Sequence, residues 1–190
     1  MLAFAVLLLA ILSRVLPHAF HAVSWNFTAL GGSLLFFGSQ LADTAANRTR
    51  TAAKLGIAIL LLMATDFYLT VFAFGYPFQV RGYVVTWVWY AAVCALSTRW
   101  LAKPSAASVI GGVLASATSF FVLSNLTVWA GGALYPRTAA GLAACYAAAV
   151  PFYRNDLVST ALTAGALFGL PVLAARIVQS VHDAGAHIEL

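Results

Sequence analysis

The chain carries an apolar run from residue 56 to residue 74 that contains a single ionisable carboxylate, Asp66. As a helix, this run is long enough to cross the hydrocarbon core of a bilayer, which is about 30 Å thick. An ionisable group inside such a span is costly unless it faces a polar cavity or a partner. The run therefore predicts a membrane-spanning helix, and it marks Asp66 as a candidate site residue.

Composition extends this prediction to the whole chain. Hydrophobic residues make up 63% of the 190 residues and charged residues 8%, whereas soluble domains carry about 25% charged residues. The length allows about six spans of about 20 residues and leaves no room for a separate soluble domain. The Lys and Arg residues behind the net charge of +5 are scattered through loops, so nucleic-acid binding is not indicated. We expect one transmembrane domain over residues 1–190.

Apolar runs bounded by loop charges, Pro, Gly and Asn place the individual spans. No Lys or Arg precedes the first run, so it is interpreted as a retained helix and not as a secretory signal. A stretch at about 138–152 would be only about 22 Å long as a helix, and it predicts an extra short, non-spanning helix between the fifth and sixth spans. The expected fold class is an all-α integral membrane protein with a six-helix transmembrane bundle. The predicted spans are about 2–16, 28–43, 55–74, 83–100, 106–124 and 157–176.

Positive charges predict the orientation of these spans. Segments 44–54 and 99–105 together hold five Lys and Arg residues, whereas the loops between them hold only Arg81 and Arg137. Cytoplasmic loops are enriched in Lys and Arg, so both richer segments are expected on the cytoplasmic side of a bacterial inner membrane. With six spans both termini are cytoplasmic as well. Seven spans, which would place the C-terminus outside, are an open alternative.

This orientation gathers aromatic and polar residues on the external side. Each has an ordinary explanation, because aromatic residues form belts at membrane interfaces, arginines extend to headgroups, and an acid can bond two helices together. Their convergence with Asp66 on one face instead favours a small-molecule pocket. The candidate ligand-binding residues are Asp66, Tyr83, Arg154, Arg137, Asn125, Trp129, Trp87, Trp25, Asn26 and Arg81.

Motifs for hydrolytic, phosphate-binding and zinc chemistry do not occur in the sequence. Cys94 and Cys145 lie in apolar stretches and are expected to be buried small side chains. His18 and His21 have a spacing that can bind metal, but no Cys or acidic residue lies nearby. Gly31-Gly32 is expected to permit close helix approach. We predict no catalytic residue, no metal and no cofactor.

Motifs spread over nearly the whole chain carry a family resemblance. They are Ser13-Arg14-x-Leu-Pro17-His18, Asn26-Phe27-Thr28, Thr65-Asp66, Ser119-Phe120-Phe121-x-x-Ser-Asn125-x-x-x-Trp129, Leu134-Tyr135-Pro136-Arg137-Thr138 and Pro151-Phe-Tyr-Arg154-Asn155. With them the chain resembles a family of small bacterial integral membrane proteins of unknown function. Its size, six-span plan and external polar cluster are also similar to the S components of energy-coupling-factor vitamin transporters. The spacing of Asp66, Tyr83 and Arg154 is similar to that in the cobalamin-type S components.

The second resemblance implies a substrate-binding and translocating membrane subunit for uptake of a small solute, with a vitamin such as cobalamin as a candidate ligand. It also implies energising transmembrane or ATPase partner subunits. Asp66 would then bind a polar group of the solute, Arg154 and Arg137 an anionic part, and the Trp and Tyr residues would form the walls. Two alternatives stay open, namely a membrane enzyme that acts on a lipid-soluble substrate with Asp66 as general base, and a structural membrane subunit.

Overall fold

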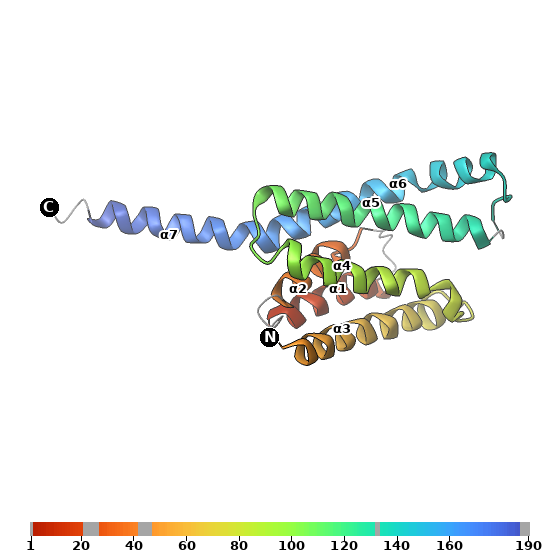
Figure 1. Cartoon of the computed structure of the whole chain (residues 1–190), viewed down its shortest axis with the longest axis horizontal. Coiled ribbons are helices and arrows are strands. Elements are labelled where there is room, and N and C mark those ends of the chain that lie inside the picture. The colour runs from red at the N-terminus through yellow and green to blue at the C-terminus, as the bar shows by residue number, and fades with distance from the viewer. Residues whose placement is uncertain (1, 21–26, 42–46, 132–133, 187–190) are drawn as a thin grey trace.

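The structure is a computed structural model that describes residues 2–20, 27–41, 47–131 and 134–186, and these residues form helices with no strand among them. Figure 1 shows a helical bundle from which the last helix projects. The predicted all-α class is confirmed. The elements are α1 (Leu2–Ala19), α2 (Leu30–Leu41), α3 (Arg48–Tyr68), the π-helical segment η2 (Leu69–Ala73), the 3-10 turn η3 (Val80–Gly82), α4 (Val84–Trp100), α5 (Ala106–Gly131), α6 (Ala139–Ala164), the π-helical segment η4 (Gly165–Gly169) and α7 (Leu170–Ala186).

Polar side chains at loop ends start two of the long helices. The side-chain oxygen of Asn47 accepts a hydrogen bond from the backbone N–H of Arg50 at 3.0 Å, at the start of α3. The Thr138 hydroxyl accepts one from the backbone N–H of Gly141 at 3.1 Å, at the start of α6. Such caps satisfy backbone donors that have no partner within the helix. They explain why α3 and α6 begin where the chain leaves the preceding loop.

The short helix α2 lies at the centre of the bundle. All of its residues from 31 to 39 are buried, and it packs against α1, α4, α5 and α6. Glycines permit this packing. A Cβ atom on Gly32 would lie 2.7 Å from the backbone nitrogen of Ala164 in α6, and one on Gly38 would lie 2.6 Å from the Cβ atom of Ser97 in α4. The expected close helix approach at Gly31-Gly32 is therefore confirmed.

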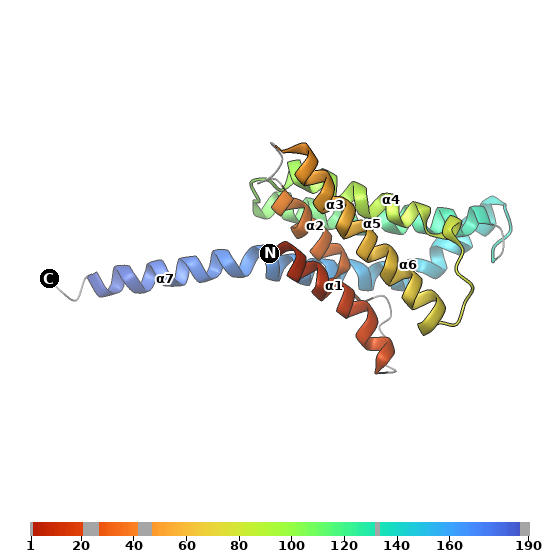
Figure 2. The same cartoon turned by 90° about the horizontal axis from the view of Figure 1, so that it is seen from below.

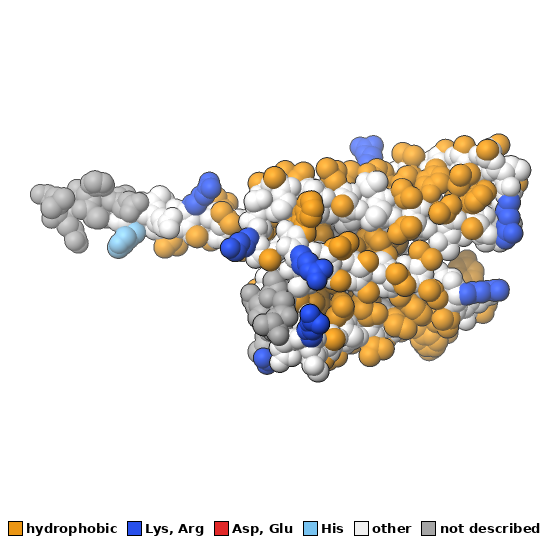
Figure 3. Space-filling model, viewed as in Figure 1, with side chains coloured by type: hydrophobic (Ala, Val, Ile, Leu, Met, Phe, Trp, Pro, Cys, Tyr) orange, Lys and Arg blue, Asp and Glu red, His pale blue; other side chains and the backbone are white. Residues whose placement is uncertain are grey.

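The bundle exposes apolar side chains and buries polar ones. Leu8 of α1 and Leu60 of α3 are 55% and 64% exposed, whereas Ser33 of α2 and Thr160 of α6 are fully buried. Figure 3 shows hydrophobic side chains spread over the sides of the bundle. A water-soluble bundle has the opposite distribution, because its apolar stripe faces the core. The exterior thus has the chemistry expected of a surface that contacts lipid.

Four helical segments are long and apolar enough to cross a membrane, by length and composition, within the part of the chain that the structure describes. Helix α2, with 12 residues, is too short to span the hydrocarbon core, and α4, with 17, is at the lower limit. The six-span bundle therefore stays a prediction. The four segments are Leu2–Ala19, Arg48–Ala73, Ala106–Gly131 and Ala139–His182.

The structure differs from the sequence prediction after residue 138. The predicted short helix at 138–152 and the predicted span at 157–176 are parts of one helical segment, Ala139–His182, which runs through η4 and has 44 residues. Its length is about 66 Å at 1.5 Å per residue. Pro151 lies inside α6, and the polar residues that follow it do not break the helix. The far half, α7, leaves the bundle (Figures 1 and 2).

Candidate functional site

A buried cluster of polar side chains joins α1, α3 and α4. Asp66 of α3 is only 2% exposed. Its Oδ1 atom accepts a hydrogen bond from Nη2 of Arg14 at 2.5 Å, which is also an ion pair. Its Oδ2 atom accepts one from the indole N–H of Trp87 at 2.9 Å. Both carboxylate oxygens therefore have a partner, and charge-assisted bonds of this kind are about twice as strong as neutral ones.

The backbone that follows Asp66 is held in place by two hydroxyl groups. The Thr70 hydroxyl donates to the Asp66 carbonyl at 2.6 Å, and it lies 2.5 Å from the Tyr83 hydroxyl. Because Thr70 has one hydroxyl proton and uses it on the carbonyl, Tyr83 is the donor in the second bond. The π-helical segment η2 closes with a bond from the Phe74 N–H to the Leu69 carbonyl at 2.8 Å. Segments of this kind occur frequently at functional sites.

Arg14 uses only part of its hydrogen-bonding capacity. Its Nη2 atom is bound to Asp66, but its Nη1 atom is buried and has no hydrogen-bond partner among the described residues. A guanidinium carries five N–H donors in a fixed fork, so the orientation of Nη1 follows from the ion pair. A buried donor without a partner costs about 1–3 kcal/mol. The Nη1 atom is therefore suited to receive an acceptor atom from a ligand.

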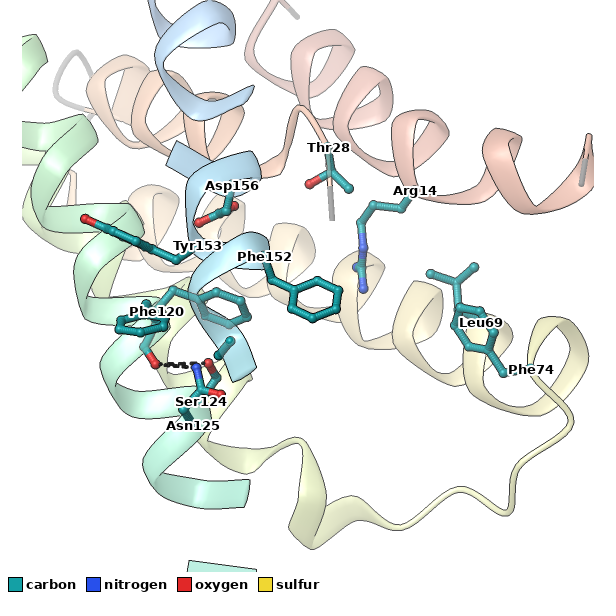
Figure 4. A pocket seen from close by; sticks show the side chains of 12 residues that line it. Arg14, Thr28, Leu69, Phe74, Phe120, Ser124, Asn125, Phe152, Tyr153 and Asp156 are labelled. Carbon is teal, nitrogen blue, oxygen red and sulfur yellow. Dashed lines mark hydrogen bonds between the residues drawn. The ribbon is translucent and has the colours of Figure 1, made fainter. Parts of the chain in front are cut away.

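A cavity of about 500 Å³ lies beside this cluster, between α1, η2, α5 and α6. Figure 4 shows that charged and aromatic side chains from several helices surround it. Its volume falls in the range of about 300–1,000 Å³ that is common for small-molecule sites. The lining residues are Arg14, Thr28, Leu69, Phe74, Phe120, Phe121, Ser124, Asn125, Ala149, Phe152, Tyr153 and Asp156.

The polar side chains of the cavity differ in how far they are satisfied. The Asn125 amide donates to the Phe121 carbonyl at 2.8 Å, as the dashed line in Figure 4 marks. The Tyr153 hydroxyl is bonded to that of Thr118 at 2.9 Å. The Asp156 carboxylate has no hydrogen bond or ion pair within the described chain. Asp156 is therefore the acid of this cavity that is free to bind a ligand.

The structure brings together three of the residues predicted from the sequence. Asp66 and Trp87 are hydrogen-bonded, and the Tyr83 ring stacks on that of Trp87 with centroids 5.9 Å apart. Asn125 lines the neighbouring cavity. Two further candidates, Trp25 and Asn26, lie outside the described residues.

The other four predicted residues do not line the cavity. Arg81 is exposed and binds the side chain of Gln79. The Trp129 indole N–H donates to the backbone carbonyl of Pro136 at 3.0 Å, near the turn that leads into α6. Arg137 and Arg154 are exposed. These positions are compatible with contacts to headgroups or to solvent.

Two residues of the site are absent from the sequence prediction, Arg14 and Asp156. Arg14 enters the sequence analysis only as part of the motif Ser13-Arg14-x-Leu-Pro17-His18 and is not among the candidate ligand-binding residues. A signal was available, because it is an ionisable residue within the expected first helix, as Asp66 is within the third. Asp156 falls between the predicted short helix at about 138–152 and the predicted span at about 157–176, and the sequence analysis does not single it out. The helix in fact continues through this residue.

No group of three or more His, Cys, Asp or Glu side chains lies close enough to hold a metal ion, within the part of the chain that the structure describes. Cys94 and Cys145 are buried and unpaired. The His18 ring packs edge-on against Phe74, with centroids 5.3 Å apart. His21 lies outside the described residues.

The fold and the site define a class of protein: an all-helical bundle with an apolar exterior that encloses a buried ion pair beside an aromatic and polar cavity. The chain belongs to a family of unknown function, DUF6580, whose model matches residues 1–181. The predicted resemblance to a family of unknown function is thereby confirmed. No curated protein and no solved structure matches the chain, and the resemblance to S components has no support from these comparisons.

Proposed function

We propose that the protein is a multi-pass membrane protein that binds a small solute in the cavity beside the Arg14–Asp66 pair and moves it across the membrane. The observation that carries this proposal is the cavity itself. It has a volume of about 500 Å³, and two charged side chains line it inside an apolar bundle. Charged side chains within membrane-spanning segments are costly, and they commonly mark substrate or ion pathways.

The size of the cavity favours a solute smaller than a corrinoid. A volume of about 500 Å³ suits a molecule with the dimensions of an amino acid or a small vitamin. Cobalamin, with its corrin ring and nucleotide loop, would require the helices around the cavity to move apart. We therefore rank cobalamin below smaller vitamins and other small solutes as the ligand.

In this proposal Asp66 is a positioning residue and does not contact the solute. Both of its oxygens are bound, one by Arg14 and one by Trp87, so its role is to fix the direction of the Arg14 guanidinium. The same contacts disfavour a membrane enzyme with Asp66 as general base, because a base needs an oxygen that faces the substrate.

The basic residues support an orientation in the membrane. Helix α3 begins with Arg48, Arg50 and Lys54, and α4 ends with Arg99 just before Lys103. Figure 3 shows several basic side chains at the end of the bundle from which α7 projects. The excess of Lys and Arg on cytoplasmic loops makes this the proposed cytoplasmic end, and both termini are proposed to lie there.

Single cysteines test this orientation in intact cells. We expect a membrane-impermeant thiol reagent to label Arg81→Cys from outside, and to label Lys103→Cys only after the cells are opened. The native Cys94 and Cys145 are buried, so their background should be low. Labelling of Lys103→Cys in intact cells would reverse the proposed orientation.

The energy source belongs to the proposal as well. The sequence holds no ATP-binding motif, so movement against a gradient requires an ion gradient or an energising partner subunit. Helix α7 extends beyond the bundle at the proposed cytoplasmic end. An energising subunit on that side of the membrane could bind to this helix.

Native mass spectrometry of the detergent-purified full chain tests solute binding. We expect a small molecule that co-purifies, or that is taken up from a panel of vitamins and amino acids including cobalamin, and that Asp156→Ala releases. Asp183→Ala, which removes an acid from α7, is the matched control and should retain it. A protein that stays empty with the whole panel would favour the structural alternative, and a bound molecule that changes in mass would favour the enzyme.

A further inference from the structure

Two charged side chains that line the cavity, Arg14 and Asp156, each carry a polar group without a protein partner in the described part of the chain. The donor is Nη1 of Arg14, which is buried and has no partner among the described residues. Its other amino nitrogen, Nη2, is held by Asp66, and Asp66 is held by Trp87. This chain of contacts fixes the guanidinium before a ligand arrives, so little conformational entropy would be lost when an acceptor binds.

The acid is Asp156 of α6. Its backbone carbonyl accepts a hydrogen bond from the Ser159 hydroxyl at 3.0 Å, but its carboxylate has no partner within the described chain. A carboxylate with apolar neighbours is stabilised by a cation or by several donors. Figure 4 shows Asp156 and Arg14 on different helices around the cavity, with the Phe152 ring between them in this view.

The charges of the site do not cancel. Arg14 and Asp66 form an ion pair and neutralise each other, whereas the negative charge of Asp156 has no counterpart in the cavity. A purely anionic ligand would satisfy Arg14 Nη1 but would add to the uncompensated negative charge. A purely cationic ligand would neutralise Asp156 but would leave Nη1 without an acceptor.

The rest of the cavity lining carries no charge and is largely apolar, with Thr28, Ser124, Asn125 and Tyr153 as its neutral polar residues. Phe74, Phe120, Phe121 and Phe152 contribute aromatic rings, and Leu69 contributes an aliphatic side chain. Such walls accommodate a ring or an aliphatic chain but provide no further charge. They suit the body of a ligand whose polar groups are directed to Arg14 and Asp156.

We propose that the cavity takes a zwitterionic small molecule with an apolar or aromatic body, such as an amino acid, with its carboxylate on Arg14 Nη1 and its ammonium group on Asp156. This inference rests on the proposed function, because it specifies the solute of the same cavity. It explains why a donor and an acid without protein partners occur together in one aromatic chamber.

Three related probes test the inference on the full chain in detergent: L-phenylalanine, which carries both charges, 3-phenylpropionate, which carries only the acid, and 2-phenylethylamine, which carries only the amine. We expect phenylalanine to bind about 10-fold more tightly than either of the others, the effect of one additional charged contact. Titration calorimetry measures the three affinities. Equal or tighter binding of either single-charge probe, or no binding of any probe at millimolar concentration, would overturn the inference.

Two variants assign the charges to residues. Asp156→Asn should lower the affinity for phenylalanine and for 2-phenylethylamine by about 10-fold, and it should leave the affinity for 3-phenylpropionate unchanged or raise it. Asp183→Asn, the same exchange on α7, should leave all three affinities unchanged. Arg14→Lys keeps a cation beside Asp66 but removes the guanidinium group, so it should lower the affinity for phenylalanine and for 3-phenylpropionate. Retained binding of 2-phenylethylamine by Arg14→Lys shows that the cavity is still folded.

The outcomes separate this inference from the proposed function. If the probes fail but native mass spectrometry finds another small molecule that Asp156→Ala releases, the zwitterionic class is wrong and solute binding stands. If the probes fail and no small molecule is found, both proposals fall. If phenylalanine binds equally well to the native chain and to Asp156→Asn, its ammonium group does not contact Asp156, and the assignment is refuted.

Discussion

Replacing Asp66 by Asn removes the negative charge from the buried ion pair and leaves the shape of the side chain almost unchanged. The side chains of Arg14 and Asp66 are 16% and 1% exposed, so the guanidinium would stay buried without a counter-charge. Loss of one partner of a buried pair costs about 3–5 kcal/mol. For a chain of this length each kcal/mol shifts the midpoint of thermal unfolding by about 2–4 °C. We therefore expect the midpoint of Asp66→Asn to fall by about 6–20 °C.

The pair also predicts a coupling between two substitutions. Arg14→Gln alone leaves the Asp66 carboxylate buried with only neutral partners such as Trp87, whereas the double variant Arg14→Gln, Asp66→Asn leaves no buried charge in this cluster. We expect the double variant to lose at least about 1 kcal/mol less than the sum of the two single losses. Thermal unfolding of the detergent-solubilised protein, followed by tryptophan fluorescence, measures all three. Single losses below about 1 kcal/mol, or losses that simply add, would refute the reasoning.

Two further predictions use matched pairs of substitutions. Trp87→Phe removes a hydrogen-bond donor to the buried Asp66 carboxylate and should cost about 1.5–3 kcal/mol of stability. Trp100→Phe removes an exposed hydrogen bond to a backbone carbonyl and should cost less than about 1 kcal/mol. Equal losses in thermal unfolding would show that the charge of Asp66 does not strengthen its bond to Trp87. Gly32→Ala places a Cβ 2.7 Å from a backbone nitrogen and should destabilise, whereas Gly56→Ala meets nothing within 4 Å and should stabilise by about 0.5–1 kcal/mol. A gain in unfolding temperature for Gly32→Ala would show that α2 and α6 are not in close contact.

The helical class follows from the sequence because it depends on local properties. Apolar runs of suitable length indicate the helices, and the structure adds local caps at Asn47 and Thr138, where two of the long helices begin. The course of the chain through residues 139–182 was not predicted because Pro151 and its polar neighbours have the same composition as a loop. Their place in a continuous helix depends on neighbouring helices, since α6 packs along α5.

Only part of the candidate site could be predicted, because a sequence shows local features but not which distant residues meet in the fold. Asp66 stands out locally, as an acid within an apolar run. Its partner Arg14 lies 52 positions away in the chain, and only the packing of α1 against α3 brings the two together. Likewise, Arg81 and Arg137 were grouped with Asp66 because loops on one side of a membrane are near each other. The structure leaves them exposed, since nothing in loop composition determines how far a side chain reaches.

Helical periodicity distinguishes Asp156 from Arg154 once the helix is known to continue. The cavity residues of α6 are Ala149, Phe152, Tyr153 and Asp156, which have the i, i+3, i+4, i+7 spacing of a single helical face. Arg154 lies off this face and is exposed. An acid that shares a face with aromatic residues inside a membrane-spanning helix is directed towards the interior of the bundle, whereas a cation one or two positions away is directed outward. The same spacing, applied to one continuous helix, places Asp156 on the face that lines the cavity, where we propose that it binds the ligand, and assigns Arg154 to the surface.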